Sequence, residues 1–223
     1  MAQNLVGVGV EIFNVQVTAA DSSYAYYSSV GTELGTSEGI LLTTGRALNA
    51  IGPNDETGLP ILDGRDGCGP ASTCDLYDND FPGSDLLTLA NGGLTTWDAT
   101  TFEFNIVPQG DSLKFGFVFA SEEYLEWVGS SFNDVFGFFI SGPGIGVDVN
   151  IALIPGTSDA VAINNVNHID NSDYYTDNQN PLGQQIQYDS LTSGLVSTIV
   201  DMSARKVPLL NLLHYEGCMH IYY

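Results

Sequence analysis

Short apolar segments separated by turn residues recur along the chain, and this pattern limits its possible folds more than any other feature. Residues 101–107 alternate strictly between apolar and polar side chains, which predicts a strand with one buried face. Residues 113–120 and 135–140 are apolar on both faces, as is typical of strands buried on both sides. The turn residues of VPQGDS lie between the first two segments, so we expect these two strands to form a hairpin.

Other parts of the chain extend the same pattern. Residues 6–17 also alternate, and a change of phase near residues 12–14 predicts a β-bulge or turn. No window of about a dozen residues has a convincing helical period. Further strand candidates are residues 39–44, 148–154, 160–164, 184–188 and 194–200. The sequence therefore predicts an all-β fold, a single β-sandwich or jelly-roll domain with long acidic loops.

The charge of the chain is strongly one-sided. Its 223 residues include 27 acidic side chains and five basic ones, for a formal net charge of -22. Such a charge repels nucleic acid and anionic membrane surfaces, so neither is an expected partner. Most carboxylates have no basic side chain to pair with, which makes a divalent cation a natural partner for those at strand ends. The alternative is that an acidic surface keeps a secreted protein soluble.

Two long irregular segments are rich in acidic residues. Residues 53–85 and 167–181 both combine carboxylates with amides at short, irregular spacing. Such oxygen atoms suit calcium, but they are also common in solvated turns, and both interpretations stay open for these segments.

The segment between the apolar strands 113–120 and 135–140 is the strongest candidate for a calcium site. Glu122 and Glu123 follow the first strand, and Asn133 and Asp134 precede the second. We expect a calcium ion to fasten this loop, with the acidic segment 75–85 completing its shell. The alternative is that these side chains accept hydrogen bonds from loop N–H groups. The predicted calcium ligands are Glu122, Glu123, Asn133, Asp134, Asp75, Asp78, Asp80 and Asp85.

Aromatic residues lie in or beside the acidic loops and suggest a binding surface. Tyr124 and Trp127 follow the two glutamates, and Asp173 precedes Tyr174 and Tyr175. Exposed aromatic rings beside a bound calcium ion would suit a glycan or a peptide as ligand. The alternative is that these rings fold back and cover the ends of strands.

Two cysteines lie close together in the first acidic segment. Cys68 and Cys74 bracket a five-residue spacer that could close a surface disulfide, with free thiols or a zinc site as the alternatives.

No histidine lies near a serine or cysteine in a recognisable nucleophile setting, and no phosphate-binding glycine loop is present. We therefore expect no enzyme. A glycan-active hydrolase that pairs Glu122 with Asp134 or Glu126 is the less favoured alternative.

Several motifs together resemble the choice-of-anchor L domain of bacterial surface proteins. They are GILLTTGRALNAIGPN, FVFASEEY followed by SFNDVFGFFISGPG, NIALIPGT, INNVN and IQYDSLT, and the resemblance spans residues 2–200. It implies a secreted, β-rich module of a larger surface protein. The leading hypothesis is an extracellular, calcium-stabilised adhesion or ligand-binding module, and the alternative is a structural spacer. No export signal or membrane span is evident, so we expect the export signal to lie upstream in a longer precursor.

The last twenty residues differ in composition from the rest of the chain. ARKVPLLNLLHYEGCMHIYY contains His214, His220 and Cys218 but lacks the preceding alternation and acidity. We therefore predict a domain over residues 1–203 and an atypical tail over residues 204–223. This tail is either a foreign reading frame or an unusual end to the domain, and we assign its histidines and cysteine no function.

Overall fold

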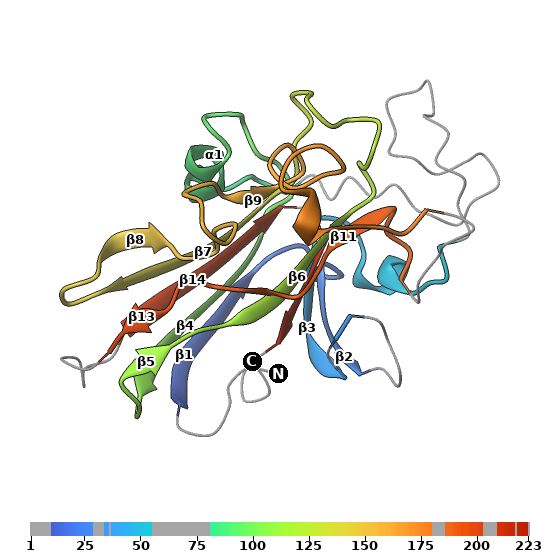
Figure 1. Cartoon of the computed structure of the whole chain (residues 1–223). Helices are drawn as coiled ribbons and strands as arrows, with labels where there is room; N and C mark the ends of the chain where they lie inside the picture. Colours follow the sequence, from blue (N-terminus) through green and yellow to red (C-terminus); the bar gives the residue numbers. More distant parts are fainter. Residues whose placement is uncertain are drawn as a thin grey trace.

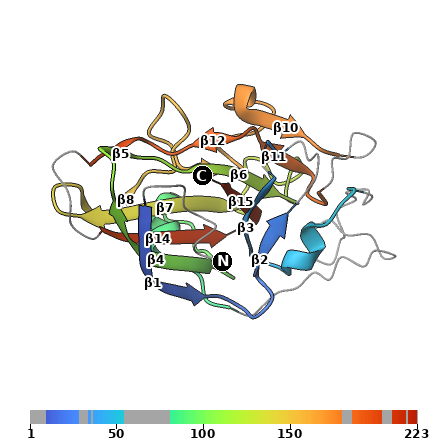
Figure 2. The ribbon, with the colours of Figure 1, turned by 90° about the horizontal axis from the view of Figure 1, so that it is seen from below.

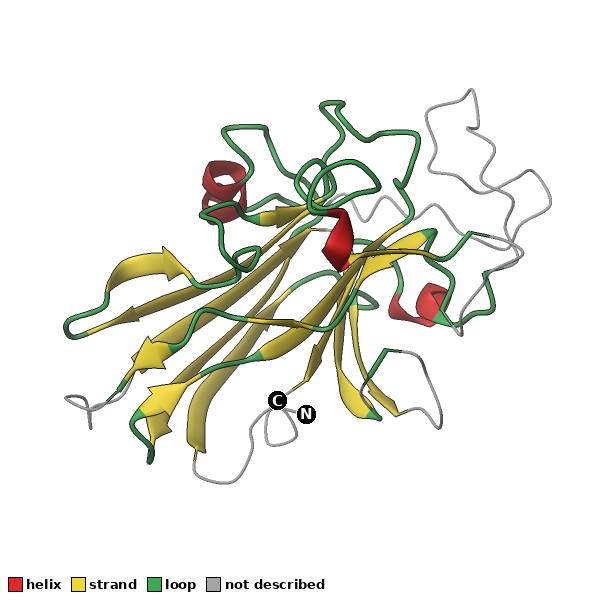
Figure 3. Ribbon diagram, in the orientation of Figure 1, coloured by secondary structure: helices red, strands yellow, loops and turns green. Residues whose placement is uncertain are grey.

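Antiparallel strands make up most of the structure. The computed structural model describes residues 10–28, 34–35, 37–54, 81–179 and 186–202, and the backbone of residues 209–216 and 218–222. Strands dominate these residues, and short helices lie among the loops (Figure 3). The all-β prediction is therefore confirmed, while the narrower jelly-roll description stays a prediction.

The first sheet has six strands in the order β1-β4-β14-β7-β8, with β9 also paired to β7 (Figure 1). Its pairs are all antiparallel. The strands are β1 (Val10–Thr18), β4 (Thr100–Pro108), β14 (Leu209–Glu216), β7 (Val135–Gly142), β8 (Gly146–Asn150) and β9 (Val161–Ala162).

The second sheet has seven strands in the order β10-β11-β6-β15-β3-β2, with β12 also paired to β6. They are β10 (Tyr175–Asp177), β11 (Ser190–Thr192), β6 (Gly116–Ser121), β15 (Cys218–Tyr222), β3 (Glu38–Thr43), β2 (Tyr24–Ser28) and β12 (Leu195–Val196). A separate small ladder joins β5 (Ser112–Leu113) to β13 (Val200–Asp201).

Aromatic side chains fill the space between the two sheets. Phe117 of β6 and Phe136 of β7 meet across the core with ring centroids 4.8 Å apart, and Phe115 lies 4.3 Å from Phe138. Figure 2 shows β1, β4 and β14 on one side of the molecule and β6, β11 and β12 on the other. Burying these rings supplies much of the hydrophobic stabilisation of the fold.

Strand β7 is apolar on both faces because each face is covered. Its outer face, with Val135 and Phe139, packs against Leu87 of helix α1 (Asp85–Ala90). A Cβ atom on Gly137 would come within 2.4 Å of the Phe139 ring, so any larger residue here would force this buried ring to move. The Oγ atom of Ser84 caps the helix by accepting a hydrogen bond from the N–H group of Leu87.

The predicted hairpin between residues 101–107 and 113–120 is wrong. Strand β4 pairs with β1 and β14 in the first sheet, whereas β6 pairs with β11, β12 and β15 in the second. The turn after β4 therefore carries the chain across the sandwich. The physical reason is the burial of β6 on both faces, which suits the interior of the second sheet better than an edge of the first.

Several other strand predictions agree with the structure. Strand β4 covers residues 101–107, with Phe102, Phe104 and Ile106 buried and residues 103, 105 and 107 half-buried. Strand β3 matches the prediction over residues 39–44. The predicted bulge in β1 is confirmed, because the register with β4 shifts between Phe13 and Gln16.

Four of the further candidates are shorter than predicted. Strand β8 ends at Asn150, β9 has two residues, and the candidate over residues 194–200 is divided between β12 and β13. The described part of the candidate over residues 184–188 forms one isolated bridge, between Ile186 and Ile51. These segments are interrupted by irregular backbone or turns that the apolar pattern does not mark.

Candidate functional site

Loops from several parts of the chain gather at one end of the sandwich (Figure 1). The loop over residues 122–134, called here the β6–β7 loop, connects a strand of the second sheet to a strand of the first and so crosses this end. The turn that follows α1 and the segment after β9 lie beside it. These loops include the predicted calcium ligands 122, 123, 133 and 134.

Asp134 is held by hydrogen bonds at the base of the loop. The hydroxyl group of Ser121 donates to Oδ2 of Asp134 at 2.7 Å, and the N–H group of Glu123 donates to Oγ of Ser121 at 3.0 Å. Glu122 and Glu123 are both half-buried. Asp134 is therefore held by a hydroxyl group. The calcium site and its alternative, hydrogen bonds from loop N–H groups, both stay predictions.

Three asparagines clamp the β6–β7 loop to its neighbours. The amide groups of Asn133 and Asn91 bond to each other, and Nδ2 of Asn91 also donates to the carbonyl oxygen of Asn133 at 3.1 Å. Oδ1 of Asn133, a predicted calcium ligand, accepts the N–H group of Asn164 at 2.9 Å. Nδ2 of Asn164 donates to the carbonyl oxygen of Ser130 at 2.9 Å, and its Oδ1 accepts the N–H group of Gly129. The second half of the loop is therefore fixed to the neighbouring segments.

Tyr124 lies in the core and has no exposed surface. Its hydroxyl group donates to the carbonyl oxygen of Val166 at 2.6 Å, and its ring meets that of Tyr175 edge-on at 5.4 Å. Burial, followed by the nearby Tyr175 and Asp134, raises the pKa of Tyr124 well above its usual value, so the hydroxyl stays a donor. The alternative of a ring covering strand ends therefore describes Tyr124, which does not line an exposed rim.

Tyr174 and Tyr175 are half-buried beside the same strand ends, and Asp173 is exposed in the short helix η3 (Ser172–Tyr174). The hydroxyl groups of Tyr175 and Ser190 are hydrogen-bonded at 2.8 Å. Burial raises the pKa of Tyr175, although the hydrogen bond with Ser190 opposes the shift. Tyr175 is therefore mainly a packing residue whose polar end is satisfied.

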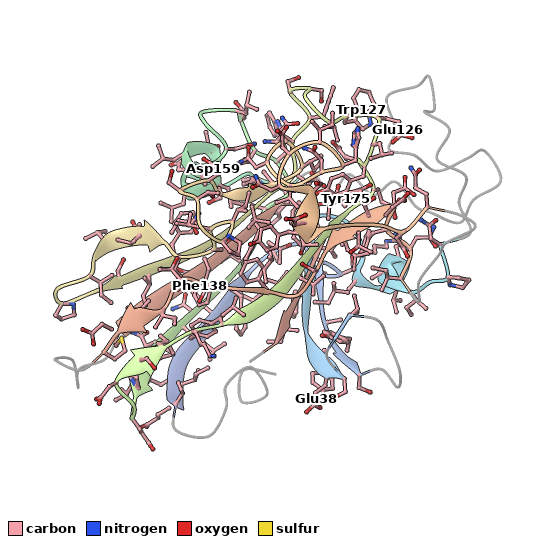
Figure 4. The ribbon with its side chains drawn as sticks, in the orientation of Figure 1. Glu38, Glu126, Trp127, Phe138, Asp159 and Tyr175 are labelled. Carbon is pink, nitrogen blue, oxygen red and sulfur yellow. The ribbon has the colours of Figure 1, made fainter. Side chains whose placement is uncertain are left out.

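The aromatic surface of this end comes from a different pair. Trp127 is half-buried and packs edge-on against Phe132, with ring centroids 4.8 Å apart, and 57% of the Phe132 surface is exposed. Figure 4 shows Glu126 and Trp127 at the outer part of the β6–β7 loop, away from Tyr175. Phe132 is not among the site residues predicted from the sequence, although a lone phenylalanine between serines and the Asn-Asp pair is an available signal.

The remaining predicted ligands do not join this loop within the described residues. Asp85 is the exposed first residue of α1. The positions of Asp75, Asp78, Asp80, Cys68 and Cys74 lie outside the described residues, so their predicted roles stay predictions. Among the residues that the structure describes, no three His, Cys, Asp or Glu side chains form a group that could hold a metal ion.

Comparison with known proteins identifies the family. The family model of the choice-of-anchor L domain matches residues 1–204. The chain belongs to the choice-of-anchor L domain family. Membership confirms the expected resemblance and indicates a domain of bacterial surface or secreted proteins. The search of curated proteins and the search of solved structures gave no match.

The family match and the two sheets of this choice-of-anchor L domain end at different residues. The family match ends at residue 204, yet the backbone of the tail forms β14 between β4 and β7, and β15 between β6 and β3. The predicted division at residue 203 stays a prediction. No helix in the described part of the domain is long and apolar enough to cross a membrane.

Proposed function

We propose that this choice-of-anchor L domain is an extracellular, calcium-stabilised module that binds a glycan or peptide ligand. The observation that carries the proposal is the aromatic pair of half-buried Trp127 and exposed Phe132 on a loop clamped by asparagines. Aromatic rings held in one place bind sugars and peptides with little loss of conformational entropy. Surface attachment in a larger protein is the expected setting.

Calcium is the part of the proposal that the charge of the domain supports. With 27 acidic and five basic residues, most carboxylates have no basic side chain available to them. At the β6–β7 loop, the side chains of Asp134 and Asn133 already accept hydrogen bonds from Ser121 and Asn164. An ion here would share these oxygen atoms and draw further ligands from main-chain carbonyl groups and water.

An array of glycans and peptides, probed with and without calcium, tests the proposal. We expect binding by the wild-type domain and its loss in a double variant, Trp127→Ala with Phe132→Ala. Val147→Ala is the control, because Val147 is an exposed apolar residue on β8, in a different part of the molecule. If the wild-type domain binds nothing in either condition, the structural spacer becomes the better description.

The proposal includes no catalytic step. Binding through an aromatic pair needs neither a nucleophile nor a general acid, and the proposed contact lies outside the half-buried Glu122 and Glu123. Release of products from a bound glycan on the array would contradict this part of the proposal. Glu126→Gln, at an exposed position beside Trp127, would then be the first variant to test.

A further inference from the structure

A buried carboxylate and a buried amide meet where residue 54 packs against the segment that leads into β11. Asp189, which precedes β11, is 2% exposed, and Asn54 is 3% exposed. Nδ2 of Asn54 donates to Oδ1 of Asp189 at 3.0 Å and to the carbonyl oxygen of Asn178 at 3.1 Å. Asn54 is therefore joined to residues that lie 124 and 135 positions away in the sequence.

The two donated hydrogen bonds fix the orientation of the Asn54 amide. Both hydrogens of Nδ2 point at acceptors, so exchanging the oxygen and nitrogen positions would break both bonds. Oδ1 of Asn54 is consequently a buried acceptor, and no donor in the described part of the chain reaches it. A buried acceptor without a partner is costly, so a ligand that satisfies it would stabilise the folded state.

The surroundings of Asp189 add negative charge. Burial is the largest influence on the pKa of Asp189 and raises it. The exposed Glu126 and Asp177 raise this pKa further, while hydrogen bonds from Asn54 and Gln179 lower it. The net result is a pKa of about 6. At neutral pH the group is therefore an ionised carboxylate beside two other carboxylates and an unsatisfied amide oxygen.

We propose that Asn54 and Asp189 form a site for a divalent cation that takes oxygen ligands, with calcium as the best fit. A cation satisfies the Asn54 oxygen and neutralises Asp189 together, which no anion or neutral donor does. This inference goes beyond the proposed function, whose calcium ion lies at the β6–β7 loop. The two sites use different ligand residues.

The chemistry of the pair sets the type of site. Calcium takes six to eight oxygen ligands, and here one carboxylate and one amide oxygen come from the side chains while water supplies others. Because the described residues provide no group of three acidic ligands, we expect weak binding, with a dissociation constant of about 10⁻⁴–10⁻³ M. That range suits a domain outside the cell, where calcium is abundant.

The consequence for the fold is a calcium-dependent junction. Asn178, which accepts from Asn54 through its carbonyl group, donates its own amide to the carbonyl oxygens of Ile186 and Tyr188 at 3.1 and 2.7 Å. An ion at the pair would therefore hold residue 54 against the two segments that lead into and out of residues 180–185. It binds the folded state alone and so raises the melting temperature.

Calorimetric titration of calcium chloride into the chelator-stripped whole chain at neutral pH tests the site. The key variant is Asp189→Asn, which keeps the shape and the acceptor oxygen but removes the charge. We expect this variant to bind one calcium ion fewer than the wild type and to lose part of the calcium-dependent rise in melting temperature. Asn54→Ala, which removes the amide oxygen, should weaken the same binding event about tenfold.

Asp159→Asn is the matched control, because Asp159 is an exposed aspartate on a different loop (Figure 4). It should bind calcium as the wild type does. Equal stoichiometry and affinity in Asp189→Asn and the wild type would overturn the proposal, as would a wild type that binds no calcium at millimolar concentration. Ligand binding on the array, measured with Asp189→Asn, separates this result from a failure of the proposed function, because Trp127 and Phe132 are unchanged.

Discussion

Replacing Asp189 by asparagine should stabilise the calcium-free domain at neutral pH. Burial raises the pKa of Asp189 from 3.8 to about 6 in the folded protein. Between these two values the folded state binds more protons at this group than the unfolded state does. The free energy of unfolding therefore falls as the pH rises through this window, and one pKa unit corresponds to about 1.4 kcal/mol. The full contribution is then about 3 kcal/mol, present below pH 3.8 and lost above pH 6.

Asparagine does not titrate, so this position does not lower the free energy of unfolding of the variant as the pH rises. Oδ1 of the new side chain can still accept the hydrogen bond that Asn54 donates at 3.0 Å. In the presence of chelator we expect the variant to be more stable than the wild type by up to about 3 kcal/mol at neutral pH. The difference should shrink as the pH falls toward the usual pKa of aspartate.

Urea unfolding of both proteins, measured from about pH 4 to about pH 7.5 in chelator, gives this difference directly. Other carboxylates titrate in both proteins, so their effects cancel when the two curves are subtracted. The exposed Asp159→Asn variant controls for the change in net charge. Parallel stability curves for wild type and Asp189→Asn across this range would refute the reasoning.

Two further predictions use unfolding and melting measurements, and a third uses mass spectrometry. Tyr124→Phe should cost about 1–3 kcal/mol in urea, because it leaves the buried carbonyl oxygen of Val166 without its donor, and an unchanged midpoint would contradict the assigned bond. Calcium at about 100 times its dissociation constant should stabilise the stripped wild type by about 2.7 kcal/mol for each ion, and Asp134→Asn should reduce the rise in melting temperature. A melting temperature that ignores both chelator and calcium would exclude this role. Non-reducing mass spectrometry should find Cys68 joined to Cys74, and recovery of both thiols free after oxidative refolding would count against the disulfide.

The parts of the fold that the sequence predicts are those set by local pattern. Strand β4 and its buried face follow from the alternation of residues 101–107, because side chains on a strand point alternately to opposite faces. The pairing of β6 does not follow from its own residues. A strand that is apolar on both faces can lie inside either sheet, and distant strands such as β11 and β15 decide which.

The candidate site likewise combines features that follow from the local sequence with features that depend on distant contacts. The position of the β6–β7 loop at a strand end was predicted, since the apolar strands on both sides of it define its limits. The burial of Tyr124 was not, because it depends on a carbonyl group at Val166 and on packing against Tyr175. The pair of Asn54 and Asp189 is separated by 135 residues, and nothing local to either residue indicates the other.

The asparagine clamp has a consequence for where this domain can work. Its members, Asn91, Asn133 and Asn164, are neutral at every pH that a bacterium meets, and their hydrogen bonds use no ion pairs. Screening by salt weakens exposed charge pairs but acts little on bonds between neutral amides. The part of the β6–β7 loop that presents Trp127 and Phe132 should therefore keep its shape in fresh water, in brine and in mildly acidic surroundings alike.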